Sequence, residues 1–178
     1  MTNDLKSILF TEEQIRARVG ALGDEITRDY AGKAPMLVGV LKGSFMFLAD
    51  LARAIGLNCE IRFLSASSYG YSSISSGNIK IGDGLDFKPA ERDIILIEDI
   101  LDTGRTLTAL KELLAGFGPS SLKICAMLDK PSRREVPIAA DYLGFECPDE
   151  FIVGYGLDYA ERYRNLPYIA SLKPDIYL

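Results

Sequence analysis

Acidic and hydroxyl side chains that could do chemistry are concentrated in one short stretch of the chain. Glu98 and Asp99 follow the apolar run 94–97, and after two apolar residues comes Asp-Thr-Gly-Arg-Thr at 102–106. A polar loop that leads into a helix binds phosphate well, because the first N–H groups of a helix lack partners and its dipole is positive there. Carboxylates accept hydrogen bonds from hydroxyl groups. The stretch therefore suits a ligand with a phosphate at one end and a sugar beside it.

The acids also bear on metal binding and proton transfer. The chain has no histidine, so a catalytic base must be another residue type, and a metal would be held by oxygen atoms, which favours Mg²⁺. Clustered carboxylates raise one another's pKa unless a cation compensates. Asp102 lies closest to the expected helix start, and we predict that it takes or holds a proton on the reacting partner.

Apolar runs and helical periodicities alternate along the chain and must position these side chains. Continuous or alternating apolar runs predict strands, and amphipathic stretches predict helices. This alternation is typical of an α/β fold with a mainly parallel sheet flanked by helices. The expected strands cover residues 36–41, 59–64, 94–97, 122–128, 138–143 and 150–157, and the expected helices cover 11–30, 45–55 and 107–115.

Charged residues follow several of the expected strands. In an open parallel sheet, ligands bind beyond the carboxyl ends of the strands, so residues at those ends lie at one edge. We therefore expect a single cluster that contains Lys42, Glu98, Asp99, Asp102, Lys130 and Asp158.

Residues 65–86 interrupt the alternation with a segment rich in serine and glycine that also contains Tyr69 and Tyr71. A loop of this length in a compact domain is typically a functional lid or is disordered. We predict that it is the most mobile segment of the chain.

The overall composition limits the classes of function. At 178 residues the chain has the size of one domain, and it can bury about 70% of its unfolded surface without disulfides or metals. Its net charge of −5 argues against a dedicated nucleic-acid-binding protein, which normally carries a basic excess. No apolar run approaches the roughly 18 residues of a membrane span, and the first residues lack the pattern of a secretory signal.

The three cysteines bear on location. Cys59, Cys125 and Cys147 are odd in number and far apart, which indicates buried thiols rather than a disulfide framework or a zinc site. Thiols of this kind are typical of a reducing compartment. We expect a cytoplasmic protein with no membrane partner.

Two further groups of side chains are interpreted as structural. Tyr155, Tyr159 and Tyr163 recur every four residues, which is typical of packing. Arg133 and Arg134 follow an expected strand and are interpreted as a solvated turn, with pyrophosphate binding or an interface as the alternative.

Comparison with known phosphate-binding motifs limits the class of phosphate site that this stretch could form. The stretch lacks the GxxxxGK[ST] of a P-loop and the GxGxxG of a dinucleotide turn. The sequence IILIEDILDTGRTL resembles instead the phosphoribosyl diphosphate-binding motif of type I phosphoribosyltransferases. LKGS at 41–44, SSYG at 67–70, DK at 129–130 and FIVGYGLDYAERYRNLPYI at 151–169 resemble the 6-oxopurine branch of that family, the hypoxanthine and hypoxanthine-guanine phosphoribosyltransferases.

This resemblance implies an architecture and a reaction. The chain would be a single domain, 1–178, with a core at about 30–145, a small hood from about 1–15 and 146–178, and a lid at 65–86. The enzyme would transfer the 5-phosphoribosyl group from phosphoribosyl diphosphate to N9 of hypoxanthine or guanine, giving IMP or GMP and pyrophosphate, with Mg²⁺ as cofactor. Members of the family also lead us to expect a homodimer or homotetramer.

The resemblance assigns roles to individual residues. Asp102 would face N7 of the purine as general base or acid, and Lys130 would donate to its 6-oxo group. Phe151 would stack on the base, and the backbone of Ile152 would read its edge. Phosphoribosyl diphosphate would be bound by Lys42, Gly43, Glu98, Asp99, Thr103, Gly104, Arg105, Thr106 and Arg164, with a non-proline cis peptide where Lys42 and Gly43 meet pyrophosphate. Mg²⁺ would be held by Glu98, Asp99 and Asp158, and Asp158 would also belong to the purine site. Ser68 and Tyr69 would belong to the lid.

Two other readings remain open. A regulator could use the same fold to sense phosphoribosyl diphosphate while binding RNA or DNA, but this would need a basic face or an added domain. An enzyme that acts on xanthine or a pyrimidine would keep the phosphate half of the site and change the base pocket.

Overall fold

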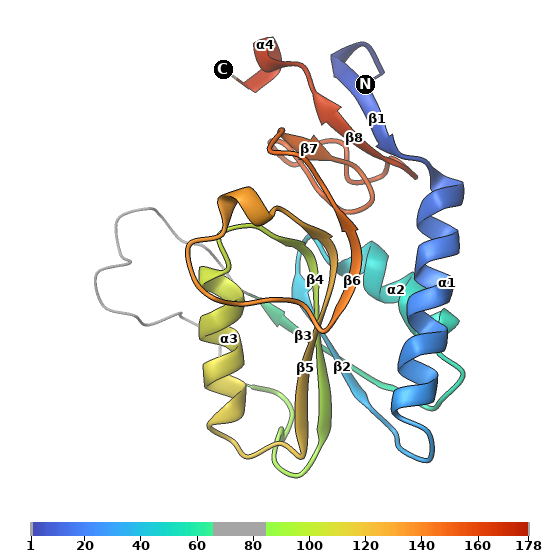
Figure 1. Cartoon of the computed structure of the whole chain (residues 1–178), viewed down its shortest axis with the longest axis vertical. Coiled ribbons are helices and arrows are strands. Elements are labelled where there is room, and N and C mark those ends of the chain that lie inside the picture. Colours follow the sequence, from blue (N-terminus) through green and yellow to red (C-terminus); the bar gives the residue numbers. More distant parts are fainter. Residues whose placement is uncertain (1, 66–84, 178) are drawn as a thin grey trace.

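The computed structural model describes residues 2–65 and 85–177, so most of the predicted lid, with Ser68 and Tyr69, lies outside the described residues. A five-stranded sheet forms the centre of the molecule (Figure 1). Its order is β3 (Glu60–Ser65), β2 (Met36–Leu41), β4 (Asp93–Leu101), β5 (Ser121–Asp129) and β6 (Tyr142–Glu146), and every neighbouring pair is parallel.

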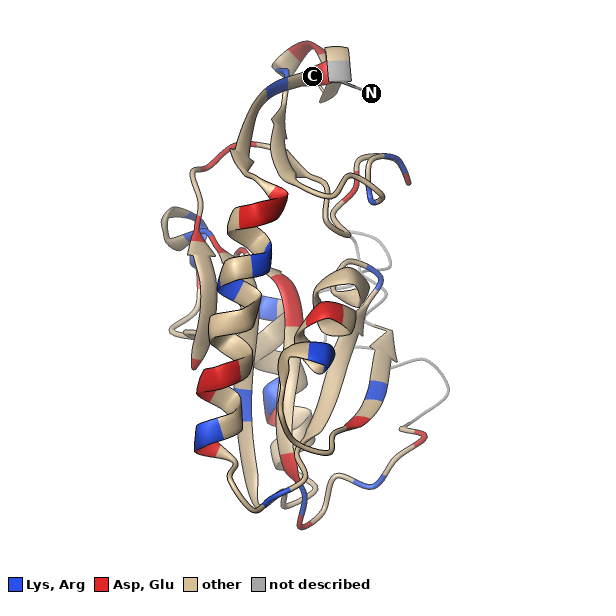
Figure 2. Cartoon of the chain, turned by 90° about the vertical axis from the view of Figure 1, so that its right-hand side faces the viewer, with Lys and Arg blue, Asp and Glu red and all other residues tan. Residues whose placement is uncertain are grey.

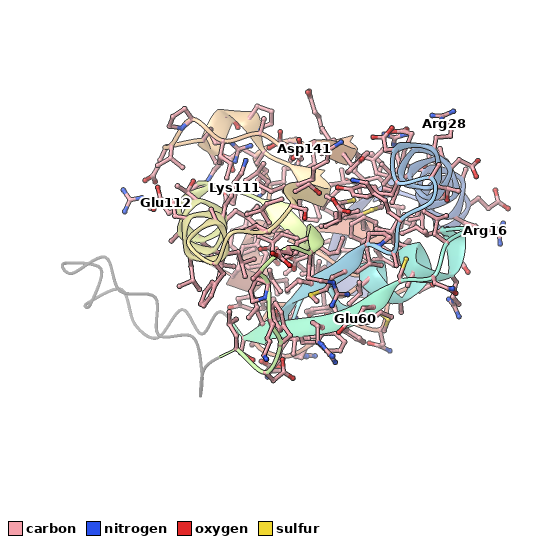
Figure 3. All side chains as sticks on the ribbon, turned by 90° about the horizontal axis from the view of Figure 1, so that it is seen from below. Arg16, Arg28, Glu60, Lys111, Glu112 and Asp141 are labelled. Atoms are coloured by element: carbon pink, nitrogen blue, oxygen red, sulfur yellow. The ribbon has the colours of Figure 1, made fainter. Side chains whose placement is uncertain are left out.

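Helices cover both faces of this sheet. On one face, α1 (Glu12–Asp29) and α2 (Phe45–Ala54) pack on Ile95 and Ile97 of β4. On the other face, α3 (Arg105–Ala115) packs on Ile94 and Leu96 of the same strand. Seen from below in Figure 3, α3 with Glu112 lies on one side and α1 with Arg28 on the other. The alternation of β4 side chains between two covered faces explains its uninterrupted apolar run.

The two ends of the chain meet in a second, antiparallel sheet at the top of Figure 1. Its order is β1 (Leu5–Phe10), β8 (Ile169–Leu172) and β7 (Ile152–Val153). It has a small core of its own, made by Val153, Tyr163, Leu166 and Leu172. The remaining helices of the described residues are short: η1 (Thr2–Asp4), η3 (Pro131–Arg133) and α4 (Pro174–Tyr177).

The structure confirms the predicted fold class and the main elements. Thr11 caps α1 and forms a capping box with Gln14, and α3 ends before Gly116. Tyr155 and Tyr163 are buried, as expected for packing residues. No helix within 2–65 and 85–177 is both long and apolar enough to cross a membrane.

Several local predictions were wrong. The expected strand 150–157 is reduced to the two residues of β7, because the chain then turns sharply through left-handed conformations at Gly154, Tyr155 and Gly156. The expected strand 138–143 lies later, at β6, while β1 and β8 were not predicted. The short segments 5–10 and 169–172 form strands because they pair with each other across the whole length of the chain.

The thiol predictions were largely correct. Cys125 and Cys147 are buried, and Cys59 is only partly buried. All three are free thiols.

Candidate active site

A cavity of about 300 Å³ lies at the carboxyl ends of β2 and β4. The last residues of these strands and the loops that follow them form most of its wall, and Asp158 and Arg164 line it from the segment after β7. This is the edge at which ligands bind in open parallel sheets. The predicted site residues that line it are Lys42, Gly43, Glu98, Asp99, Asp102, Thr103, Gly104, Thr106, Asp158 and Arg164.

The loop between β4 and α3 has the geometry of an anion site. Gly104 precedes the helix with φ of 85°, a conformation that favours glycine. A Cβ at this position would also lie 2.5 Å from Ile138 Cγ2, so the loop packs closely on the segment after η3. Thr103 Oγ1 accepts a hydrogen bond from the backbone N–H of Arg105 at 3.4 Å. The positive end of α3 therefore faces the cavity.

Arg105 is the one member of the predicted phosphate loop outside the cavity wall. Its guanidinium forms an ion pair with Glu135 on the exposed surface. The hydrogen-bond donors that this loop offers to the cavity are therefore backbone N–H groups rather than the Arg105 guanidinium.

Glu98 and Asp99 are adjacent residues near the end of β4, and both line the cavity. Glu98 Oε1 accepts a hydrogen bond from the N–H of Asp99 at 3.3 Å, and Asp99 Oδ1 accepts one from the N–H of Ile100 at 2.9 Å. Burial, followed by the charge of Asp99, raises the pKa of Glu98 well above its usual range. Burial also raises the pKa of Asp99. A cation in the cavity would offset both effects.

The loop after β2 lies directly against these acids. A Cβ at Gly43 would fall 1.5 Å from Asp99 Oδ2, and a Cβ at Gly156 would fall 2.1 Å from the carbonyl oxygen of Gly43. Three chain segments therefore meet at one point, and two of them need glycine there. The peptide bond between Leu41 and Lys42 is cis, as the resemblance implied.

The predicted Mg²⁺ ligands do not form one preassembled cluster. Within the described ranges, no three acidic, cysteine or histidine side chains are grouped closely enough to hold a metal. Asp158 instead forms an ion pair with Arg164 at 2.8 Å. Mg²⁺ usually takes one or two carboxylates and completes its shell with water and substrate phosphates, so the adjacent carboxylates of Glu98, which is buried, and Asp99, which is partly buried, fit this ion.

Asp102 is held by two arginines of the loop after β5. Arg133 Nε donates to Asp102 Oδ1 at 3.1 Å, and this contact raises the pKa of the Arg133 guanidinium. Arg134 donates to the Asp102 carbonyl oxygen and forms an ion pair with Asp129. Only 16% of the Arg134 side chain is exposed, so the interpretation as a solvated turn was wrong for Arg134. Arg133 is exposed, as that interpretation expected.

Three residues predicted to bind the base, Lys130, Phe151 and Ile152, lie outside the cavity wall, whereas Asp102 and Asp158 line it. Lys130 is buried, its N–H bonds to the carbonyl of Leu101 at 3.0 Å, and its Nζ donates to the carbonyl of Glu150 at 2.7 Å. Phe151 stacks on Tyr177 with 4.8 Å between ring centres and meets the edge of Tyr159 at 5.3 Å. Ile152 is buried in β7.

Three charged residues in contact with the site were not predicted from sequence as site residues: Arg133, Arg134 and Glu161. Glu161 forms an ion pair with Lys42 at 3.0 Å. The partners in these contacts are up to 119 positions apart, and no local pattern marks them.

The parallel sheet, the loop at the start of α3 and the acid pair beside it together define a phosphoribosyltransferase, and the family described as phosphoribosyl transferase domain matches residues 7–160. Hypoxanthine-guanine phosphoribosyltransferase of Bacillus subtilis is 51% identical over 99% of this chain and 98% of the relative. A crystal structure of a hypoxanthine phosphoribosyltransferase from Staphylococcus aureus superposes with a TM-score of 0.95 at 48% identity, over 100% of this chain and 97% of that one. The chain belongs to the hypoxanthine-guanine phosphoribosyltransferase family.

Some relatives are much longer. The bifunctional protein TilS/HprT of Listeria innocua is 49% identical over 99% of this chain, which spans 27% of the length of that protein.

Proposed function

We propose that the protein transfers the 5-phosphoribosyl group of phosphoribosyl diphosphate to N9 of a 6-oxopurine, hypoxanthine and also guanine, giving IMP or GMP and pyrophosphate. The observation that carries this proposal is the cavity in which the acid pair Glu98 and Asp99 adjoins the N-terminus of α3. Such a site accommodates a phosphate and a ribose at once. The family membership supports the purine as acceptor.

In this proposal the loop at the start of α3 takes the 5′-phosphate. The backbone of Thr103 to Thr106 and the two threonine hydroxyls donate to the phosphate oxygens, and Arg105 adds positive charge nearby. Glu98 and Asp99 accept hydrogen bonds from the ribose hydroxyls. As pyrophosphate leaves, positive charge builds on the ribose ring, and these carboxylates stabilise it.

Catalysis in this family involves a metal ion, and we assign Mg²⁺ to this chain. Glu98 and Asp99 would hold it, and Asp158 would help with a second ion after exchanging its present contact with Arg164. When bound, Mg²⁺ neutralises charge on the departing pyrophosphate. Lys42, Gly43 and Arg164 line the same cavity and would bind that anion.

The purine would be recognised at the edge of the small sheet. Asp102 would exchange a proton with N7, and Lys130 would donate to the 6-oxo group. Adenine carries an amine at that position, so two donors would face each other and both would stay unpaired, which strongly disfavours it. Phe151 would stack on the base through the ring face opposite Tyr177. The backbone of Ile152 would contact the edge of the base.

In this proposal the two sheets carry different parts of the active site. The five-stranded core carries the phosphate and ribose site, and the small sheet acts as a hood that carries the base site. Ser68 and Tyr69 stay predicted members of a lid that excludes water from the reactive ribose cation.

A regulator that binds nucleic acid is the alternative from another class. Such a protein would need a basic face, whereas the net charge is −5. In the view of Figure 2, basic and acidic residues are interspersed along the ribbon. These observations favour the enzyme.

Steady-state kinetics with four bases tests the proposal. We expect high kcat/KM for hypoxanthine and guanine, lower values for xanthine, and values at least about 10⁴-fold lower for adenine, since a polar site rejects a mismatched group by this order. High activity with adenine or with pyrimidines alone would contradict the proposed base site.

We further propose a homodimer or homotetramer in the cytoplasm. Three free thiols are consistent with a reducing compartment. Light scattering of the purified chain at several concentrations measures the assembly, and a monomer at all of them would contradict it.

A further inference from the structure

Glu161 bridges the two cations assigned to pyrophosphate. Its Oε1 lies 3.0 Å from Lys42 Nζ and 3.5 Å from Arg164 Nη2. Lys42 follows β2, whereas Glu161 and Arg164 belong to the loop after β7, so the contact joins the core to the small sheet. A single carboxylate oxygen thus occupies the place that an anionic ligand would take between these cations.

The backbone around Glu161 presents its side chain in this direction. Glu161 has φ of 60°, and its N–H donates to Asp158 Oδ2 at 2.9 Å. Arg164 Nη1 donates to the carbonyl of Gly156 at 2.8 Å, and Gly156 packs closely on Gly43. The turn that carries Glu161 is therefore anchored on the same loop that carries Lys42.

We propose that Glu161 sets the affinity for pyrophosphate and for phosphoribosyl diphosphate, because its carboxylate takes the place of a phosphate oxygen between Lys42 and Arg164 while the site is empty. This inference rests on the proposed function, in which these two cations bind the leaving group. Each ligand must displace Glu161 before it can engage them. The residue therefore lowers the affinity for both ligands and favours the release of pyrophosphate.

The strength of the contact suits such an exchange. Side-chain exposures of 68% for Lys42 and 66% for Glu161 leave the pair accessible to an incoming ligand. Exposed ion pairs are weak, and a pyrophosphate carries several negative charges where Glu161 carries one, so the ligand wins the competition. Arg164 is held more firmly, because 19% of its side chain is exposed and Asp158 also binds it. Its Nε is buried without a hydrogen-bond partner among the described residues.

Calorimetric titration with sodium pyrophosphate in excess MgCl₂ tests the inference. Glu161→Gln keeps the size of the side chain and removes its charge, and we expect it to lower the Kd about threefold to tenfold, the size expected for the loss of two exposed ion pairs. The matched control is Glu25→Gln, which changes the net charge equally. It removes an ion pair with Arg18 in α1, and neither residue lines the cavity. This control should leave the Kd unchanged.

A double-mutant comparison assigns the effect to the bridge. The gain in affinity from Glu161→Gln should shrink in a Lys42→Met background. The gain of the single variant over wild type should also shrink as ionic strength rises. Glu161→Ala serves as a second variant, so that misfolding of one variant does not decide the result.

An unchanged or higher Kd in folded Glu161→Gln and Glu161→Ala would overturn the inference while leaving the proposed function intact. Failure of the wild-type protein to bind pyrophosphate would instead contradict the proposed function itself. The two failures are therefore distinguishable.

Discussion

The carboxylate of Asp99 lies against the α-carbon of Gly43, so closely that a Cβ at position 43 would fall 1.5 Å from Asp99 Oδ2. This contact joins the loop after β2, which carries Lys42, to the acid pair at the end of β4. In the proposed function, one segment binds pyrophosphate and the other binds ribose and metal. Their contact places the pyrophosphate site next to the ribose site, on the two sides of the bond that breaks.

Gly43→Ala should therefore damage catalysis more than folding. The added methyl group must displace either Asp99 or the loop after β2, and misplacement of catalytic groups by about 1 Å can cost about 100-fold in rate. We expect a fall of at least that order in kcat/KM for phosphoribosyl diphosphate. Gly20→Ala is the matched control, since no heavy atom lies within 4 Å of its Cβ position. Equal activity of the two variants would refute the role given to this contact.

Asp102→Asn should reduce kcat by about 10² to 10⁴, the usual contribution of a general acid or base, while phosphoribosyl diphosphate still binds. Rapid-quench or steady-state kinetics gives the rate, and calorimetry gives the Kd. Asp149→Asn is the control, because Asp149 is a second carboxylate that contacts Arg133, at 3.8 Å. Normal turnover by Asp102→Asn would remove Asp102 from the role of base.

Lys130→Met should impair use of the base selectively. Loss of a hydrogen bond from a charged donor should lower kcat/KM for hypoxanthine about 10- to 100-fold, with little change in KM for phosphoribosyl diphosphate. Lys6→Met is the control, because Lys6 also contacts Glu150, through its carboxylate at 2.9 Å, on the exposed surface. Parallel loss for both substrates, or a lowered melting temperature alone, would indicate that Lys130 has only a structural role.

The hydrogen bond between Tyr155 and Asp50 should make stability depend on alkaline pH. The hydroxyl donates to Asp50 Oδ2 at 2.7 Å, and burial, followed by this bond, raises the pKa of Tyr155 above the value of about 10 in unfolded chains. The contribution to stability is therefore fully present below pH ~10 and is lost as pH rises further, because the unfolded state ionises first.

Tyr155→Phe removes this bond and should lower the free energy of unfolding by about 1 kcal/mol at pH 7. Urea denaturation at pH 7 and at pH 10.5 to 11 measures the difference from wild type, which should narrow at the higher pH. A difference that stays constant between the two pH values would show that the bond is not linked to the ionisation of Tyr155.

Much of the core and the phosphate site could be predicted because their signals are local. The apolar run of β4 alternates between two covered faces, and the leucines of α3 recur at helical spacing. The acids, Gly104 and the threonines lie in the short connection between these two elements, so their relative placement follows from the chain itself. The resemblance of this stretch to a known motif then indicated phosphoribosyl diphosphate as the ligand.

The α/β class, the edge of the sheet that carries the site and the loop at the start of α3 follow from local patterns in the sequence. The position of the small sheet next to the cavity depends on tertiary packing, since β1 and β8 are short and pair across almost the whole chain. It also decided that Arg133 holds Asp102, that Glu161 bridges Lys42 and Arg164, and that Asp99 needs glycine at position 43. Periodicity records which face of one element is buried, whereas contacts between distant segments depend on how the elements pack, and that information is absent from any local pattern.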